Sequence, residues 1–252
     1  MACINADYHT HTRYSHGFIK PHAKGTVMEN ADAAAALGLE FLGISDHGPG
    51  HIGYGLDMKK LTQIRTDIEA AKKAHPGLEI QLSVEANIIN PSGLLDVSPE
   101  EQKLFDYIIA GYHYGIFGRA PFKAAMVHAG GYWYGATGRS SQRALEYNTD
   151  LVLAALEKNR LLILTHPGDK AAFDIQSIAS ACEKCGTWME INAHHPCLTV
   201  EGIRISMEYD VKFVLSSDAH LPANVGRVES ALARAIEAGL DLNRIVNYRA
   251  EG

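Results

Sequence analysis

The chain has 252 residues, of which 46% are hydrophobic, so it can bury a full core. No proline- or serine-rich linker divides it, and a single domain over residues 1–252 is the simplest interpretation. The formal net charge of -6 argues against a nucleic-acid-binding surface, and no basic run favours an anionic membrane. An anionic substrate would therefore have to be attracted by bound metal.

The expected location is the cytoplasm. The N-terminal sequence reaches Asp7 before any apolar stretch of signal-peptide length, and no run of roughly 18 apolar residues follows it. Four cysteines in a chain of this length do not make a disulfide framework, so we expect reduced thiols at Cys3, Cys182, Cys185 and Cys197.

Strand-like runs alternate with helical patterns along the whole chain. The predicted strands cover residues 4–9, 40–47, 78–88, 107–113, 161–166, 187–193 and 212–218. The predicted helices include residues 57–74, 140–158, 174–185 and 224–238. Strict alternation predicts a parallel sheet with helices outside it, because parallel neighbours need a crossover connection. The sheet could be open and doubly wound, or closed into a barrel.

Side chains that bind metals recur at the ends of these strands. Six of the seven predicted strands end at or just before one of them, and the remaining strand ends at Asn192 and His194. A (β/α) barrel draws its chemistry from many strand ends, whereas an open sheet gathers it at one switch point. We therefore predict a seven-stranded barrel, with eight strands as the alternative. The nine candidate ligands are His9, His11, His16, His47, Glu85, His113, His166, Asp218 and His220.

The number and types of these residues indicate a multinuclear site. Imidazole and carboxylate groups bind zinc, iron or manganese, and nine of them exceed the three or four that one zinc ion takes. Period-two alternation in the third strand predicts that Glu85 points into the barrel while Ile80, Leu82 and Val84 meet the helices. Other histidines lack this context: His22, His51, His75 and His128 are expected on the surface, whereas His194 and His195 are candidates for lining a substrate site.

Six segments in chain order resemble the metal motifs of the PHP family, named for polymerase and histidinol phosphatase, and especially its stand-alone phosphoesterases. They are DYHTHTRYSHG, GISDHG, SVEANI, IAGYHYGIF, ILTHPGDK and LSSDAH, and they span Asp7 to His220. The resemblance implies a distorted (β/α)7 barrel with a three-metal centre that hydrolyses phosphate esters. It implies a first metal held by His9, His11, Glu85 and Asp218, a second held by Glu85, His113 and His166, and a third held by His16, His47 and His220. Many relatives carry Asp where His16 stands.

The expected reaction is hydrolysis of a small phosphomonoester by a metal-bound hydroxide, with Glu85, Asp218 and His220 as catalytic residues. Three divalent ions, zinc above all with iron or manganese as alternatives, would keep the centre cationic and attract phosphate. The alternatives are a histidinol-phosphate phosphatase, a metal-dependent nuclease and a metal-stabilised scaffold without activity. The acidic net charge argues against the nuclease, and the full set of ligands argues against the scaffold.

The long stretch over residues 112–139 follows the fourth predicted strand and is rich in glycine and aromatic residues. It is too long for an ordinary connection between a strand and a helix. Arginine presents a fork that fits phosphate oxygens, so Arg119 or Arg139 is a candidate for binding the ester. In the alternative interpretation, the aromatic residues pack at the barrel rim or at the interface of a homo-oligomer.

Overall fold

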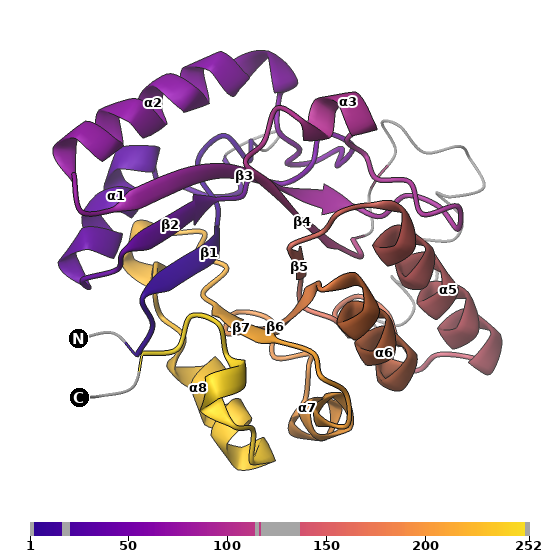
Figure 1. Cartoon of the computed structure of the whole chain (residues 1–252). Helices are drawn as coiled ribbons and strands as arrows, with labels where there is room; N and C mark the ends of the chain where they lie inside the picture. Colours follow the sequence, from indigo (N-terminus) through magenta and orange to yellow (C-terminus); the bar gives the residue numbers. More distant parts are fainter. Residues whose placement is uncertain (1–2, 17–20, 114–115, 117–136, 250–252) are drawn as a thin grey trace.

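A computed structural model describes residues 3–16, 21–113, 116 and 137–249. Its seven strands all pair in parallel, in the order in which they follow one another along the chain. The first and last strands meet through a bridge between Thr10 and Ala219, where the His11 amide donates to the Ala219 carbonyl at 2.9 Å. The predicted seven-stranded barrel is confirmed (Figure 1). The strands are β1 (Ala6–Thr10), β2 (Phe41–Ile44), β3 (Glu79–Asn87), β4 (Tyr107–Gly111), β5 (Ile163–Leu164), β6 (Trp188–Asn192) and β7 (Phe213–Ser216).

Helices surround the ring of strands and pack against its outer face (Figure 1). Three of the predicted helices lie close to their expected positions, and the first of them is preceded by a single 3-10 turn, η1 (Met58–Lys60), capped by Asp57. The short 3-10 turns η2 (Pro222–Asn224) and η3 (Leu242–Arg244) lie near the C-terminus. The helices are α1 (Val27–Ala36), α2 (Leu61–Ala74), α3 (Pro99–Gln102), α5 (Gln142–Lys158), α6 (Ile175–Cys185), α7 (Val200–Met207) and α8 (Glu229–Ala238).

The prediction of a helix from residue 224 was wrong at its N-terminal end. The chain first makes the turn η2, and Gly226 then takes a left-handed conformation with φ of 71°. An α-helix cannot pass through that conformation, so α8 begins only at Glu229. A Cβ atom on Gly226 would also lie 2.8 Å from the Leu37 side chain, so this position suits glycine on steric grounds too.

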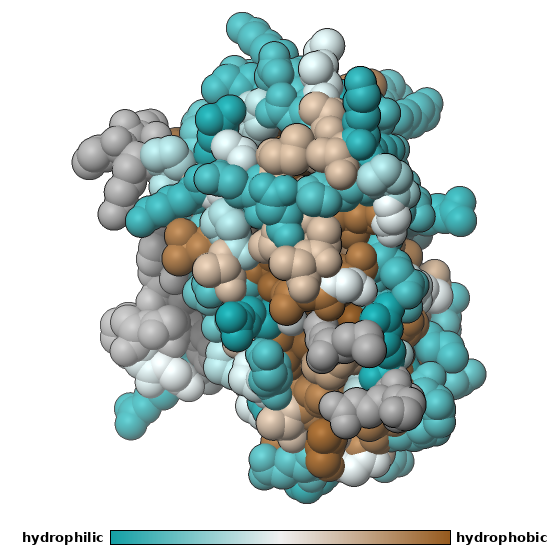
Figure 2. All heavy atoms as spheres, turned by 90° about the vertical axis from the view of Figure 1, so that its left-hand side faces the viewer, coloured by the Kyte–Doolittle hydropathy of each residue, from teal (hydrophilic) through white to brown (hydrophobic). Residues whose placement is uncertain are grey.

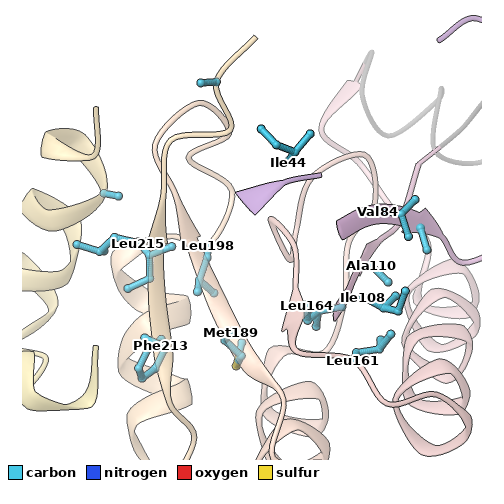
Figure 3. Packing of buried hydrophobic residues seen from close by; sticks show 14 of the residues in the cluster. Ile44, Val84, Ile108, Ala110, Leu161, Leu164, Met189, Leu198, Phe213 and Leu215 are labelled. Atoms are coloured by element: carbon cyan, nitrogen blue, oxygen red, sulfur yellow. The ribbon is translucent and has the colours of Figure 1, made fainter. Parts of the chain in front are cut away.

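The alternation of side chains across the sheet separates an outer core from the barrel interior. Val84 pairs in register with Ile108, and Met189 with Phe213, and all four pack in the large apolar core shared with the helices (Figure 3). Each buried leucine- or phenylalanine-sized side chain in that core contributes about 1.5–3 kcal/mol of hydrophobic stabilisation. The predicted outward face of the third strand is therefore confirmed.

The barrel interior has an apolar floor. Ile109, Ile163 and Val214 form a separate buried cluster, against which Tyr8 and Trp188 pack. These residues share the inward face with Glu85 and Glu190, since Glu85 pairs with Ile109 and Glu190 with Val214. The apolar floor closes the interior on one side of the buried carboxylates. A substrate or an ion therefore reaches the buried carboxylates from the carboxyl ends of the strands.

Among the described residues, the large hydrophobic side chains exposed to solvent do not gather on one helix or strand. Figure 2 shows the face turned to the left in Figure 1, where hydrophilic side chains predominate and hydrophobic ones form a band through its middle and lower part. The exposed large hydrophobic residues are scattered over several elements, as is ordinary for a globular protein. In the described ranges, every helix is too short or too polar to cross a bilayer.

Candidate metal centre

Eight of the nine predicted ligands converge at the carboxyl ends of the strands. His9 lies in β1 and His11 directly after it, His47 follows β2, Glu85 lies in β3, and the remaining four follow β4, β5 and β7. Seven of the eight are buried, and His220 is partly exposed. Their burial in a protein interior requires that their polar atoms find partners. The residues brought together are His9, His11, His47, Glu85, His113, His166, Asp218 and His220.

Glu85 stands at the middle of this cluster, and its two oxygens face different histidines. Oε1 lies 2.8 Å from His166 Nε2 and 3.3 Å from His113 Nε2. Oε2 lies 3.4 Å from His9 Nε2 and 2.9 Å from His47 Nδ1. A carboxylate with separate nitrogen ligands at each oxygen has the arrangement needed to bridge two cations.

Four ligand atoms near Asp218 have the spacing of a metal site. Asp218 Oδ1 lies 3.0 Å from His11 Nε2 and 3.6 Å from His9 Nε2, and the two histidine nitrogens are 3.1 Å apart. Glu85 Oε2 lies 3.4 and 3.6 Å from the same two nitrogens. A tetrahedral zinc ion with bonds of about 2.1 Å separates its ligand atoms by about 3.4 Å. These residues therefore fit a divalent metal ion.

Unsatisfied atoms support the same interpretation. Glu85 Oε2, Asp218 Oδ1 and both ring nitrogens of His47 are buried and make no hydrogen bond of good geometry within the described part of the protein, although Oε2 faces His47 Nδ1 at 2.9 Å and Oδ1 faces His11 Nε2 at 3.0 Å. An unpaired buried atom such as His47 Nε2 costs about 1–3 kcal/mol. His47 is close enough to form two further groups of potential ligands, one with His11 and His220 and one with Glu85 and His113. Bound cations would satisfy all of these atoms at once.

The charges of the buried carboxylates and histidines compete with burial in setting their pKa values. Burial by itself lowers the pKa of His9, but the charges of Asp218, Glu85 and Glu190 outweigh burial and raise that pKa well above its usual range. Burial raises the pKa of Glu85, but nearby histidines, His113 and His9 first among them, hold it well below its usual range. Protons in the metal-free protein thus occupy places that cations would take.

The backbone is strained at this site. Among the described residues other than glycine, only His166, Lys170 and Asp218 have positive φ angles, of 29°, 60° and 52°. Each such conformation costs on the order of 1–3 kcal/mol and persists only when surrounding structure enforces it. All three residues border one cavity of about 330 Å³ at the mouth of the barrel. Strain concentrated around one cavity marks it as the functional site.

Comparison with known proteins agrees with this geometry, although no family model matches the sequence. A protein of Thermoanaerobacter sp. named "Probable phosphatase" is 29% identical over 257 residues, covering 96% of this chain and 89% of the relative. One of Acetivibrio thermocellus with the same name is 27% identical over 254 residues, covering 97% and 91%. The solved structure of histidinol phosphate phosphatase from Lactococcus lactis, complexed with zinc, L-histidinol and phosphate, superposes with a TM-score of 0.62 at 15% identity and covers 94% of each chain.

The likeness to proteins named "Probable phosphatase" extends over nearly the whole chain and agrees with the barrel and its converging motif residues. The resemblance to the PHP family is confirmed. Two of the ligand sets that this resemblance implies match the observed contacts: His9, His11, Glu85 and Asp218 lie together, and His113 and His166 share the other oxygen of Glu85.

Of the third ligand set that this resemblance implies, His47 and His220 lie in one potential metal-binding group, together with His11. His16 is exposed and belongs to none of the potential metal-binding groups among the described residues. His22, expected on the surface, is exposed, yet its ring centroid lies 4.6 Å from that of His220 and 5.3 Å from that of His47. Its ring also stacks on Tyr54 at 3.9 Å. His22 also belongs to none of those groups, but it lies beside His47 and His220, the other two members of this set.

Backbone contacts explain why sequence reasoning missed His22. It follows no strand, but its amide donates to the Ser15 carbonyl at 3.0 Å, and the Lys24 amide donates to the His220 carbonyl at 2.9 Å. These two bonds hold the segment beside His220, where His22 lines the cavity at the mouth of the barrel. His51 was also expected on the surface but is buried, with its ring stacked on Tyr54 at 3.5 Å.

Glu190 is a second residue that sequence reasoning missed. It is fully buried in β6, and its Oε1 accepts a hydrogen bond from His9 Nδ1 at 2.7 Å. Oε2 accepts from the His166 amide at 2.6 Å and from Asn192 Nδ2 at 2.9 Å. A carboxylate that holds Nδ1–H fixes the imidazole so that Nε2 is free for a metal. Its inward position in a predicted strand was the signal that could have revealed it.

Only some of the residues predicted to bind substrate line the cavity. His194 and His195 line the cavity, together with His22, Tyr54, Asp169 and Lys170, whereas Arg139 is exposed and is not part of its lining. Arg119 lies outside the described residues. A larger hollow of about 720 Å³ between α5 and α6 contains no histidine or cysteine, so the smaller cavity is the candidate site.

Proposed function

We propose that this protein is a metal-dependent phosphatase that hydrolyses small phosphomonoesters at a trinuclear centre. The observation that carries the proposal is the position of Glu85, whose two oxygens each contact a separate group of buried histidines. The likeness to proteins named "Probable phosphatase" supports the same reaction class. We further propose zinc in this centre, with iron or manganese as alternatives, because imidazole and carboxylate ligands suit all three.

Three groups of residues would hold the ions. His9, His11, Glu85 and Asp218 form the first, and His113 and His166 share Glu85 with it as the second. For the third ion we propose His47 and His220, which form a potential metal-binding group with His11, and His22, whose ring lies beside both, in place of His16. When bound, the ions supply a nucleophile at neutral pH and stabilise the attacking and leaving oxygens of an in-line displacement.

The protein residues position this chemistry and set its charge. Glu85, Asp218 and Glu190 contribute three negative charges, and the pKa of each is held below its usual range by the surrounding histidines, which outweigh burial. Neutral histidines add no charge, so three divalent ions would leave the site cationic and attractive to phosphate. The cavity of about 330 Å³ admits a small ester but not a nucleic-acid duplex.

The test is hydrolysis of p-nitrophenyl phosphate by zinc-loaded protein, with bis(p-nitrophenyl) phosphate as the diester control. We expect turnover of the monoester, its loss on chelation, and its recovery when zinc returns. His113→Ala should abolish activity, whereas His75→Ala should not, because His75 pairs with Asp32 away from the site. A metal-replete protein without monoesterase activity would refute the enzyme and leave the scaffold interpretation. Preference for the diester would favour a nuclease.

A further inference from the structure

One wall of the cavity carries a pair of opposite charges. Asp169 and Lys170 lie in the turn after His166, and both line the cavity. Lys170 Nζ lies 2.7 Å from Asp169 Oδ2, and the two side chains are only 24% and 12% exposed. Among the described residues that line this cavity, Lys170 is the only lysine or arginine.

The turn that carries this pair is built rigidly. Gly168 and Lys170 take positive φ angles of 100° and 60°. The Asp169 amide donates to the His166 carbonyl at 3.0 Å, and the Ala171 amide donates to the Asp169 carbonyl at 2.7 Å. A left-handed lysine is unfavourable in an ordinary turn. Its presence here points to a need for the ammonium group at this place.

The pair reaches toward the proposed metal centre through His195. Asp169 Oδ2 lies 3.4 Å from His195 Nδ1, and His195 Nε2 lies 3.7 Å from Asp218 Oδ2. A phosphate held at the metal ligands would therefore have its alcohol part within reach of this wall. We name Asp169, Lys170 and His195 the leaving-group subsite.

The charges of this subsite select among alcohols. An ammonium group would be attracted by Asp169 but repelled by Lys170, and a carboxylate would meet the reverse arrangement. Either ion would have to disrupt a preformed pair to gain a partner of its own. A hydroxyl group both donates and accepts, so it can bind Asp169 and Lys170 together without separating them.

We propose that Asp169 and Lys170 recognise the leaving group, and that the natural substrates are small phosphomonoesters of uncharged, hydroxyl-bearing alcohols. This inference rests on the proposed phosphatase function and adds the substrate class. The cavity of about 330 Å³ suits an alcohol of a few carbon atoms beside the phosphate.

Three phosphomonoesters that differ in the charge of the alcohol test the proposal, with p-nitrophenyl phosphate as the reference substrate. Glycerol 3-phosphate has a neutral alcohol, phosphoethanolamine carries an ammonium group, and 3-phosphoglycerate carries a carboxylate. With zinc-loaded protein we expect the highest kcat/KM for glycerol 3-phosphate. Lys170→Gln should favour phosphoethanolamine, and Asp169→Asn should favour 3-phosphoglycerate, each by about fivefold relative to the neutral substrate, because a charge pair in contact with solvent contributes about 1 kcal/mol.

Controls separate this inference from the proposed function. Lys170→Arg keeps the charge and should keep the preference for the neutral substrate, and Lys184→Gln on the exposed surface of α6 should change nothing. Metal content should stay the same in all variants. If p-nitrophenyl phosphate is hydrolysed but both charge-removing variants keep the original kcat/KM ratios among the three substrates, this inference is refuted and the phosphatase stands. If the metal-loaded protein hydrolyses no monoester, the proposed function itself fails.

Discussion

Replacing Glu190 with glutamine should weaken one metal position far more than the others. Glu190 accepts three hydrogen bonds, from His9 Nδ1, the His166 amide and Asn192 Nδ2. Glutamine has the same size but only one accepting oxygen, and its NH2 group would face a donor. The imidazole of His9 would lose the partner that fixes its orientation toward Asp218 and Glu85.

The magnitude follows from the charge on Glu190. A hydrogen bond to a charged group contributes about 1.5–3 kcal/mol. Removing an outer-shell partner of a metal ligand lowers metal affinity by about 10- to 100-fold, which corresponds to about 1.4–2.7 kcal/mol. The energy of the lost hydrogen bond and the expected loss of metal-binding free energy are thus of similar size. We therefore expect the ion nearest His9 to dissociate at a chelator concentration about 10- to 100-fold lower than in the unchanged protein.

The assay is a chelator titration of zinc-loaded protein, with the ions that remain bound counted by elemental analysis. Glu190→Gln should lose one ion early and keep the rest. Glu201→Gln is the matched control, because Glu201 lies exposed on α7 away from the site. The reasoning about Glu190 is wrong if its variant and the control release all ions at the same chelator concentration, within about twofold.

Three further predictions concern the proposed ligands. Glu85→Gln should lose metal and turnover together, and a variant that keeps full metal content with half its activity would contradict a bridging role. His22→Ala should lower metal content whereas His16→Ala should not, and the reverse result in elemental analysis would restore the original assignment. Burial lowers the pKa of His166, but Glu85 outweighs it and raises that pKa to about 9. This raised pKa stabilises the metal-free protein below about pH 6.5, and the stabilisation is lost as the pH rises to about 9. Zinc loading at pH 7.5 should therefore release protons, also from His9, and an indicator dye that detects none would argue against these ligands.

The sequence was sufficient to predict the barrel and most of the site for one physical reason. In a parallel barrel every strand delivers its last residues to the same rim, so ligands at successive strand ends must meet. This is why His47, His113 and His166, which are far apart in the sequence, could be placed together. The inward position of Glu85 followed from the period-two alternation of its strand.

The residues that were missed depend on contacts that no local pattern encodes. His22 reaches the cluster through its own backbone bond to Ser15 and through the bond from Lys24 to His220, and neither bond leaves a periodic signal. The alternation of its strand could have placed Glu190 inside the barrel, but its partner, His9, is identified only by the folded structure. The late start of α8 depends on the left-handed conformation of Gly226, where a Cβ atom would meet the side chain of Leu37 from a distant segment.

The central claim is that buried strand-end ligands assemble a metal centre that hydrolyses phosphomonoesters. The most direct test is to titrate metal-stripped protein with zinc and to follow p-nitrophenyl phosphate hydrolysis against the number of ions bound per chain. The arrangement of His9, Glu85 and His113 predicts that activity rises to a plateau at about three ions per chain. A plateau at one ion, or no hydrolysis at any occupancy, would contradict it.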